Sequence, residues 1–208
     1  MSLQSASSVF PERTYMIRKK FFRILGAGFQ IFDPAGNVVV WSEQKAFKLK
    51  EDIRIFGDEA HEHEILSIHA RSWLDFAAAY DVTDSRSGEK VGAFKRKGFR
   101  SFLKDQWIIM DPSDQDIGVI DEESAMLAVI RRFVPYGDFV PQKFTVTVGG
   151  QTVCEYRQHF NPLIQKITVD FTPDSMGLLD RRLGMAGGIL LSAIEQRQGS
   201  GGIGWPTD

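Results

Sequence analysis

The stretch Leu183–Ile194, LGMAGGILLSAI, carries no charged side chain on any face. A helix that is apolar all round is buried all round. As a helix this stretch spans only about 18 Å, against ~30 Å for the hydrocarbon core of a bilayer, so it is too short to cross a membrane. We predict a helix from Leu178 to Gln198 whose apolar centre fills the interior of the domain as a plug. The plug side chains are Leu183, Met185, Ile189, Leu190, Leu191 and Ile194.

Three glycines in this helix, Gly184, Gly187 and Gly188, favour a tight enclosure. Each costs about 1 kcal/mol in a helix interior, so the helix is viable only when burial stabilises its large apolar side chains by ~2 kcal/mol each. Glycine also allows a surrounding wall to approach the helix backbone. A β barrel that closes around the helix meets both needs and leaves fewer exposed sheet edges.

Upstream of the helix, the sequence repeats with a period of 26 residues. The repeat positions are Phe21, Phe47, Trp73 and Phe99, and a strand-like run with a turn signal follows each. The turn signals are Asp33–Asn37, Gly57–Asp58, Asp84–Gly88 and Asp111–Asp114. Such clusters accept the backbone angles of turns, and repeats this short without intervening helices cannot form a parallel sheet. We therefore predict a mainly β fold, an antiparallel meander closed into a barrel.

The segment between the repeats and the helix predicts one more short helix and three strands. Acidic residues from Asp121 and basic residues at Arg131 and Arg132 match the dipole of a helix near 122–132. Three alternating runs then predict half-buried strands, and Gly149-Gly150 joins the first two as a hairpin. We expect a flexible N-terminal segment over 1–14, a single barrel domain over 15–198 and a flexible tail over 199–208.

Composition restricts the class of partner. The net charge is −2 and the pI is about 6.1, so no global field attracts nucleic acid. The single cysteine, Cys154, excludes an intramolecular disulfide and suits a reducing compartment. The N-terminus lacks the features of a secretory signal. We expect a cytoplasmic domain, peripheral at the membrane, with no transmembrane segment.

Units of strand, turn and strand such as Ile31–Val38, followed by the apolar helix with Gly184–Leu191, resemble the Tubby C-terminal-like superfamily. Within it the chain looks like the LURP-one-related and phospholipid-scramblase-like proteins, and the resemblance covers Met16 to Gln198. It implies a barrel of about twelve antiparallel strands around a C-terminal helix. Tubby proteins bind phosphoinositides, and scramblase-like members associate with membranes. Cys154 does not replace the palmitoylated cysteine-rich stretch of scramblases, so lipid scrambling is not expected.

Two basic clusters are the candidate contacts for anionic lipid headgroups. The first consists of Lys95, Arg96, Lys97, Arg100 and Lys104, and the second of Arg18, Lys19 and Lys20. If the repeats are neighbours in the barrel, the two clusters could share a surface. The alternative interpretation is a solvated outer strand face whose lysines oppose aggregation.

The segment His61-Glu62-His63-Glu64 invites a metal interpretation. On a strand, His61, His63 and His69 would project to one side, and two imidazoles with a carboxylate can bind zinc. The spacing matches no established motif, and a solvated hairpin tip is favoured. We predict no metal site and no cofactor.

Three functions follow from these observations. The first is a non-enzymatic binding or regulatory module that contacts anionic phospholipid or a protein partner through an outer basic patch. The second is a structural or protein-interaction module that uses a barrel edge or an exposed Phe/Trp patch. The third is a metal-dependent enzyme that uses His61 and His63.

Overall fold

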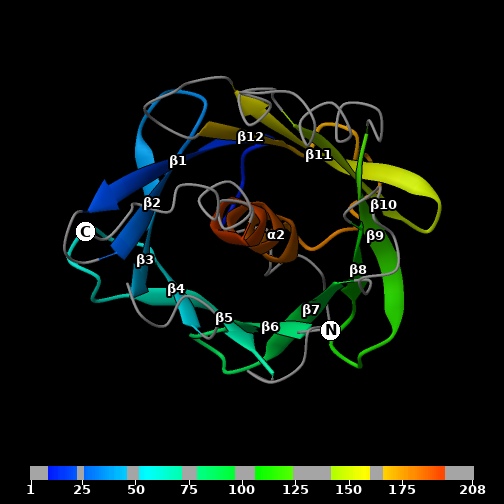
Figure 1. Ribbon diagram of the computed structural model, residues 1–208, viewed down its shortest axis with the longest axis horizontal. Coiled ribbons are helices and arrows are strands. Elements are labelled where there is room, and N and C mark those ends of the chain that lie inside the picture. The colour runs from blue at the N-terminus through cyan, green and yellow to red at the C-terminus, as the bar shows by residue number, and fades with distance from the viewer. Residues whose placement is uncertain are drawn as a thin grey trace, which may run out of the picture.

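A closed antiparallel barrel of twelve strands forms the body of the molecule, and one helix lies near the C-terminus (Figure 1). The computed structural model describes residues 9–22, 26–45, 52–71, 79–96, 106–123, 142–159 and 166–194. The strands are β1 (Thr14–Phe22), β2 (Gly26–Phe32), β3 (Val38–Lys45), β4 (Asp52–Phe56), β5 (Glu64–Ala70), β6 (Ala79–Asp84), β7 (Lys90–Arg96), β8 (Gln106–Met110), β9 (Asp116–Glu122), β10 (Lys143–Val148), β11 (Gln151–His159) and β12 (Lys166–Asp170). The predicted mainly β, closed antiparallel fold is confirmed.

Each strand pairs with its neighbours in sequence, and β1 pairs with β12 to close the ring. At the closure, Thr14 lies opposite Asp170, and Arg18 lies opposite Lys166. The described sheet therefore has no edge strand that a partner chain could extend.

Aspartates organise the turns at one end of the barrel. Asp33 accepts the backbone N–H of Asn37 at 2.8 Å, and Asp111 accepts those of Ser113 and Gln115 at 2.8 and 2.9 Å. Such carboxylate bonds to nearby backbone amides explain why the Asp-led signals mark hairpins. This end also carries the Gly149-Gly150 turn, and we call it the turn end.

The opposite end of the barrel receives the C-terminal ends of β1, β3, β5, β7, β9 and β11. Of the four repeat aromatics, Phe21 belongs to β1, while Phe47, Trp73 and Phe99 lie outside the described residues. The helix predicted near 122–132 is not found at its first residue, because Glu122 ends β9. The rest of that helix, from 124 onward, lies outside the described residues.

The helix α2 (Arg181–Ile194) runs through the ring of strands (Figure 1). It begins three residues later than the sequence predicts, because Asp174 accepts the backbone N–H groups of Leu178 and Leu179 at 2.8 and 3.1 Å in a separate turn. Asp180 then caps the helix by accepting the N–H of Arg182 at 2.9 Å. The predicted residues beyond Ile194 lie outside the described part of the chain.

Side chains of α2 are buried against the barrel wall, and β1, β7 and β12 are among the strands that the helix contacts. Five of the six residues named as plug side chains are at most 2% exposed: Leu183, Met185, Ile189, Leu190 and Leu191. The side chain of Ile194 is not among those described. At Gly187 an added Cβ would stand 2.7 Å from the hydroxyl oxygen of Tyr156 and 3.1 Å from Phe94. The same Tyr156 hydroxyl donates to the carbonyl of Gly184 at 2.7 Å, so the wall reaches the helix backbone where glycine allows it.

The packed structure includes residues that precede β1. Phe10 is fully buried, and its ring lies edge-on to that of Tyr15 with centroids 5.7 Å apart. Arg181 donates from Nη1 to the carbonyls of Phe10, Pro11 and Glu12 at 3.1, 2.8 and 2.6 Å. The start of α2 thus holds part of the segment that the sequence assigned to a flexible N-terminus.

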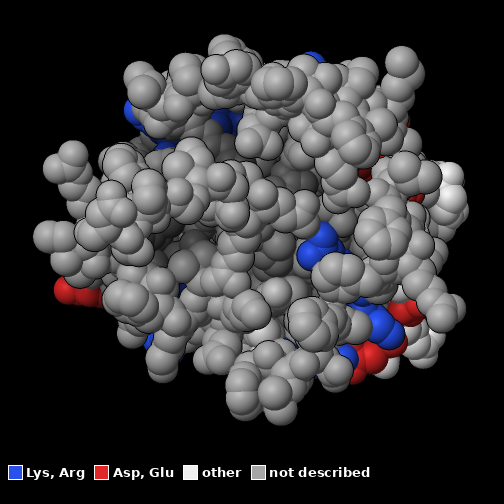
Figure 2. Space-filling model, viewed as in Figure 1, with Lys and Arg blue, Asp and Glu red and all other residues white. Residues whose placement is uncertain are grey.

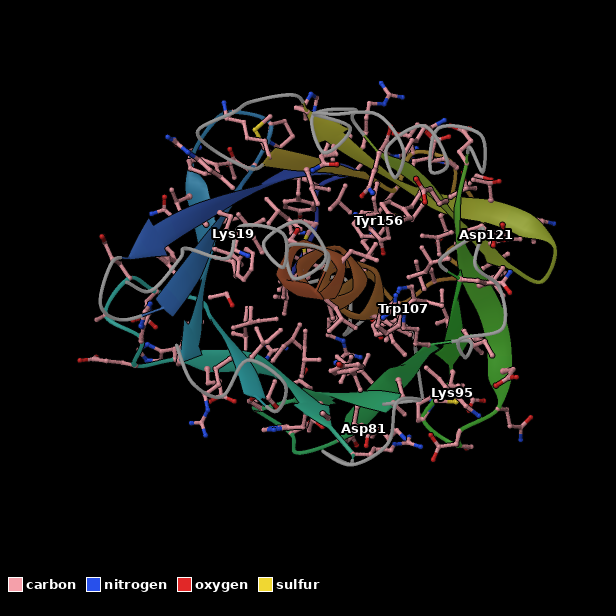
Figure 3. All side chains as sticks on the ribbon, in the orientation of Figure 1. Lys19, Asp81, Lys95, Trp107, Asp121 and Tyr156 are labelled. Carbon is pink, nitrogen blue, oxygen red and sulfur yellow. The ribbon has the colours of Figure 1, made fainter. Side chains whose placement is uncertain are left out.

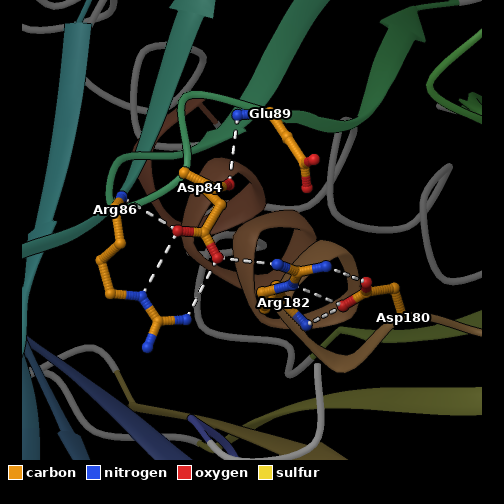
Figure 4. A network of polar contacts seen from close by, with 6 residues as sticks. Asp84, Arg86, Glu89, Asp180 and Arg182 are labelled. Carbon is orange, nitrogen blue, oxygen red and sulfur yellow. Dashed lines mark hydrogen bonds and ion pairs between the residues drawn. The ribbon is translucent and has the colours of Figure 1, made fainter. Parts of the chain in front are cut away.

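A polar network fixes the N-terminal end of α2 to the hairpin between β6 and β7 (Figure 4). Asp84 is 3% exposed and accepts from Arg182 at 2.7 Å and from Arg86 at 3.1 Å. Arg182 also donates to Asp180 at 2.7 Å. Burial alone would raise the pKa of Asp84, but the bonds from Arg86 and Arg182 outweigh it and lower the pKa to about 2.

Leu190→Asp tests the enclosure of α2. Leu190 is 2% exposed, and an unpaired carboxylate buried there costs several kcal/mol, on the order of the whole stability of a domain. We expect the variant to unfold, with loss of the cooperative thermal transition in circular dichroism. Leu190→Met, which conserves volume, should stay within about 1.5 kcal/mol of the wild type. A folded Leu190→Asp protein would contradict the enclosure.

Asp84→Asn tests the network at the start of α2. The folded-state pKa of about 2 lies below the ordinary value, so this carboxylate contributes stability above about pH 4 that is lost as the pH falls towards 2. The free energy of unfolding of the variant should be about 2 kcal/mol below that of the wild type at pH 7. It should also fall less steeply than that of the wild type between pH 4 and 2. Urea unfolding at a series of pH values from 7 to 2 measures the stability of the wild type and of the variant. If the two stabilities fell in parallel with pH, the low pKa of Asp84 would be contradicted.

Candidate functional site

The first basic cluster is only partly described by the structure. Lys95 lies exposed on the outer face of β7. Arg96, the next residue, takes the opposite side and places its guanidinium 6.0 Å from the ring of Trp107, which points into the barrel (Figure 3). The other members, Lys97, Arg100 and Lys104, lie outside the described residues. Lys95 is therefore the one member of this cluster that the described residues place on the outer face.

The second cluster divides between the two sides of β1. Arg18 faces outward, whereas Lys19 is 4% exposed and points towards α2 (Figure 3). Lys19 lies inside because it shares its strand face with buried Tyr15 and Ile17. This corrects the expectation that Lys19 belongs to an outer patch. The backbone of Lys20 continues β1, but its side chain is not among those described.

Lys19 has a contact at the C-terminal end of α2. Its Nζ donates to the carbonyl oxygen of Ser192 at 3.3 Å and lies 5.3 Å from the ring centroid of Phe29. A cation at this end of a helix complements the helix dipole. Burial lowers the pKa of the Lys19 ammonium to about 8.

Of the described members, Arg18 and Lys95 lie on strands at opposite sides of the barrel. Five strands separate β1 from β7 in either direction around the ring. The condition for a shared surface, that these repeats be neighbours, is therefore not met by β1 and β7.

Closure of the barrel places new residues beside Arg18. Lys166 of β12 lies directly opposite Arg18, and His159 of β11 lies opposite Lys166. All three alternate with residues that face the interior, such as Ile17 and Ile167. We call Arg18, Lys166 and His159 the outer basic row. The sequence analysis did not single out Lys166 and His159. They could have been found from the requirement that the first strand of a closed barrel pairs with the last.

The charges of the outer basic row are not neutralised within the described residues. No carboxylate pairs there with Arg18 or Lys166, and Arg18 Nε is buried without a hydrogen-bond partner. Like charges directly opposite one another on adjacent strands destabilise a sheet. His159 contacts the hydroxyl of Thr168 at 2.7 Å. The row thus presents positive charge that the described fold leaves uncompensated.

Several other charged residues of the outer surface form ion pairs. Lys143 lies 3.0 Å from Glu123 and 3.3 Å from Glu155, although it adjoins the row. Farther around the barrel, Arg71 bonds Asp81 at 2.7 Å. In Figure 2, basic and acidic side chains of described residues likewise adjoin each other at the lower right. The outer basic row differs from these regions because no acidic partner for Arg18 or Lys166 lies among the described residues.

Of the histidines of the metal hypothesis, His61 and His63 lie in the turn before β5 (Glu64–Ala70), whereas His69 lies within that strand. His61 has a φ of 58° and stacks on Phe56 with ring centroids 4.6 Å apart. His63 Nδ1 lies 3.0 Å from a carboxylate oxygen of Asp58. His61 and His63 thus lie in the connection between β4 and β5, where the favoured interpretation of a hairpin tip places them, and they share no strand face with His69, because β5 begins only at Glu64. Within the ranges that the structure covers, no group of three or more potential ligands could hold a metal ion.

The apolar surface also differs from expectation. The large hydrophobic residues exposed in the described chain are Met176 and Leu178, at 67% and 38%. Both precede α2 at the turn end, and neither is aromatic. The described sheet offers no barrel edge to a partner, because it is closed. The described residues also show no exposed Phe/Trp patch, because Met176 and Leu178 are the large hydrophobic residues exposed there.

Comparison with models of protein families identifies the class of protein to which this closed barrel with its C-terminal helix belongs. A model of the LURP-one-related family matches residues 40–191, more than half of the sequence. The chain therefore belongs to the LURP-one-related family, which is part of the Tubby-like superfamily, as the resemblance predicted. No match was found among curated proteins. In the described portion of the chain, no helix is long and apolar enough to cross a membrane.

Lys19→Met tests the buried ammonium. The folded-state pKa of about 8 lies below the ordinary 10.5, so the unfolded chain binds more protons between these values and wild-type stability rises with pH across this window. We expect the variant to gain up to about 3 kcal/mol relative to the wild type at pH 7. This gain should shrink towards pH 10.

Urea unfolding at pH 7, 9 and 10 measures this difference. Lys19→Arg serves as the control, because a guanidinium stays charged throughout the window and should remove the pH dependence without removing the charge. A constant difference between the wild type and Lys19→Met at all three pH values would contradict the low pKa of Lys19.

Proposed function

We propose that this LURP-one-related domain is a non-enzymatic binding module that contacts anionic lipid headgroups through the outer basic row. The observation that carries the proposal is the direct opposition of Arg18 and Lys166 on adjacent strands without a carboxylate partner among the described residues. Such an arrangement is unfavourable alone and becomes favourable beside negative charge.

The interior supports a function on the outside of the barrel. The apolar side chains of α2 occupy the centre and act as a plug, with Met185 and Ile189 fully buried. Interior groups that could react are placed unfavourably: burial raises the pKa of the Cys154 thiol well above its ordinary value, which disfavours the reactive thiolate. Catalysis in a central pocket is therefore not part of the proposal.

The overall charge of the chain favours a local contact over a general one. Because the net charge is −2, attraction to an anionic membrane must come from one face and must turn that face towards the surface. Basic side chains near an anionic surface contribute about 1 kcal/mol each. The contact is thus weak, oriented and sensitive to salt.

Co-sedimentation with vesicles tests the proposal. The wild type should bind vesicles that contain phosphatidylserine, should not bind neutral phosphatidylcholine vesicles, and should dissociate as the salt concentration rises. The double variant Arg18→Gln/Lys166→Gln removes both uncompensated charges and should bind about 30-fold more weakly.

A control with the same change in charge is Lys95→Gln/Arg54→Gln, since both residues lie on other strands of the barrel. It should retain wild-type vesicle binding. Equal losses in the two double variants would show that net charge and not the row is responsible. Absence of salt-sensitive binding by the wild type would refute the lipid contact altogether.

A second candidate function, protein interaction, is favoured by one observation. Met176 and Leu178 project into solvent beside the start of α2, and Asp174 holds their loop by accepting the N–H of Leu178. Two held apolar side chains give a small contact for a protein partner. This alternative would be favoured if the wild type did not bind vesicles but self-associated in a concentration-dependent way, and if Met176→Ser reduced the self-association.

A further inference from the structure

The residues that precede β1 are held by contacts of the kind that proteins use to bind a short extended peptide. Phe10 is the anchor, because its side chain is 0% exposed, whereas the three residues after it lie exposed. When an extended peptide binds a protein, main-chain hydrogen bonds give affinity, and pockets for side chains give specificity. We call Phe10–Arg13 the strap.

Hydrogen bonds hold the strap by its main chain. Arg181 Nη1 donates to the first three carbonyl oxygens of the strap, at 3.1, 2.8 and 2.6 Å. The fourth carbonyl accepts the N–H of Phe171 at 2.7 Å. The N–H of Glu12 donates to the hydroxyl of Tyr15 at 2.7 Å. All of these bonds use main-chain atoms of the strap, so they do not depend on which side chains surround the anchor.

The site that receives the strap consists of two aromatic residues and one arginine. The ring of Tyr15 lies edge-on to that of Phe10, with centroids 5.7 Å apart. The guanidinium carbon of Arg181 lies 5.7 Å from the ring centroid of Phe171, a cation–π contact that helps to orient the guanidinium towards the strap. Tyr15 belongs to β1, and Phe171 directly follows β12. The site therefore lies at the turn end, where the barrel closes.

The strap is coupled to the start of α2 through Arg181. This residue opens the helix, where the helix dipole disfavours a cation, and the first turn contains no acidic residue. The strap carbonyls supply the negative partial charge that this turn lacks. The next residue, Arg182, has carboxylate partners of its own in Asp84 and Asp180. The start of α2 thus keeps a separate attachment to the barrel when the strap leaves.

Release of the strap does not require the barrel to open. The paired register of β1 and β12 begins at Thr14 and Asp170, so the strap lies outside it. Only one strap side chain, that of Phe10, is buried. Segments with few buried contacts open locally at a lower free energy than the whole domain.

We infer that the turn end carries a docking site for a short extended peptide with one aromatic anchor, built from Tyr15, Phe171 and Arg181, and that the strap is its exchangeable occupant. The strap occludes the site, so a peptide segment of a partner protein gains access only when the strap leaves. This inference goes beyond the proposed lipid contact, because it uses neither Arg18 nor Lys166.

Binding of a peptide to the full chain tests the site. The probe is a fluorescein-labelled peptide with the sequence of residues 9–14, and Phe10→Ala weakens the strap within its own site. Fluorescence anisotropy should show saturable binding of the peptide to this variant. The wild type should bind the peptide at least about tenfold more weakly, because its own strap competes at a high effective concentration.

Two controls separate the site from general stickiness. A peptide with alanine in place of the phenylalanine should bind neither protein. Phe10→Ala/Arg181→Gln should bind the original peptide at least about tenfold more weakly than Phe10→Ala does. Phe10→Ala/Lys95→Gln, with the same change in charge on β7, should bind it as Phe10→Ala does. Absence of saturable binding to Phe10→Ala, or equal binding of the two peptides, would overturn the inference.

Hydrogen exchange of the wild type keeps the inference testable even where Phe10→Ala does not fold. The amides of Glu12 and Phe171 bond across the strap and should exchange at least about tenfold faster than the amides of the β1–β12 ladder, because the strap opens locally. Equal exchange rates would show that the strap leaves only when the barrel unfolds, and would overturn its exchangeable role. Neither measurement involves vesicles, so its outcome is separate from that of the lipid proposal.

Discussion

The hydrogen bonding of β1 to β12 is the constraint on which the other features depend. It turns an open meander into a ring, and only a ring can surround a helix that lacks a polar face. Without it, Leu190 and the other apolar residues of α2 would meet water along the opening. The same pairing sets Arg18 against Lys166 on the outside. Enclosure of the core and concentration of positive charge therefore have one origin.

Charge also determines how α2 is held along the barrel axis. Arg181 and Arg182 occupy the first turn, where the helix dipole disfavours cations. The carboxylates of Asp84 and Asp180 bond Arg182, and three backbone carbonyls accept from Arg181. At the other end, Lys19 donates to the carbonyl of Ser192. Charged side chains thus fix each end of α2 to a different part of the barrel, and within the apolar run the Tyr156 hydroxyl adds a bond to the carbonyl of Gly184.

The fold followed from sequence because its signals are local. The uncharged run Leu183–Ile194 requires an enclosure, and the spacing of the Asp-led turns indicates a meander. The start of α2 was misplaced because the side chain of Asp174 captures the amides of Leu178 and Leu179, a contact that hydrophobic pattern does not encode.

The candidate site was predicted less well than the fold. Lys19 follows the alternation of buried Tyr15 and Ile17 along β1, and this alternation predicts that it points inward. The interpretation of Arg18, Lys19 and Lys20 as one outer patch overlooked the alternation. Lys166 and His159 depend on the register between β12 and its two neighbours. That register is set by packing over the whole ring, so inspection of separate strands does not give it.

The contact between Lys19 and Ser192 joins residues 173 positions apart. At ribosomal rates of about 5–20 residues per second, the second partner emerges roughly 10–35 s after the first. Hairpins with their own aspartate turns can form during this interval, because their contacts are local. Their inner faces, however, lack a helix to cover them until translation reaches α2. In a nascent chain, the barrel can therefore close around α2 only after translation has reached this helix.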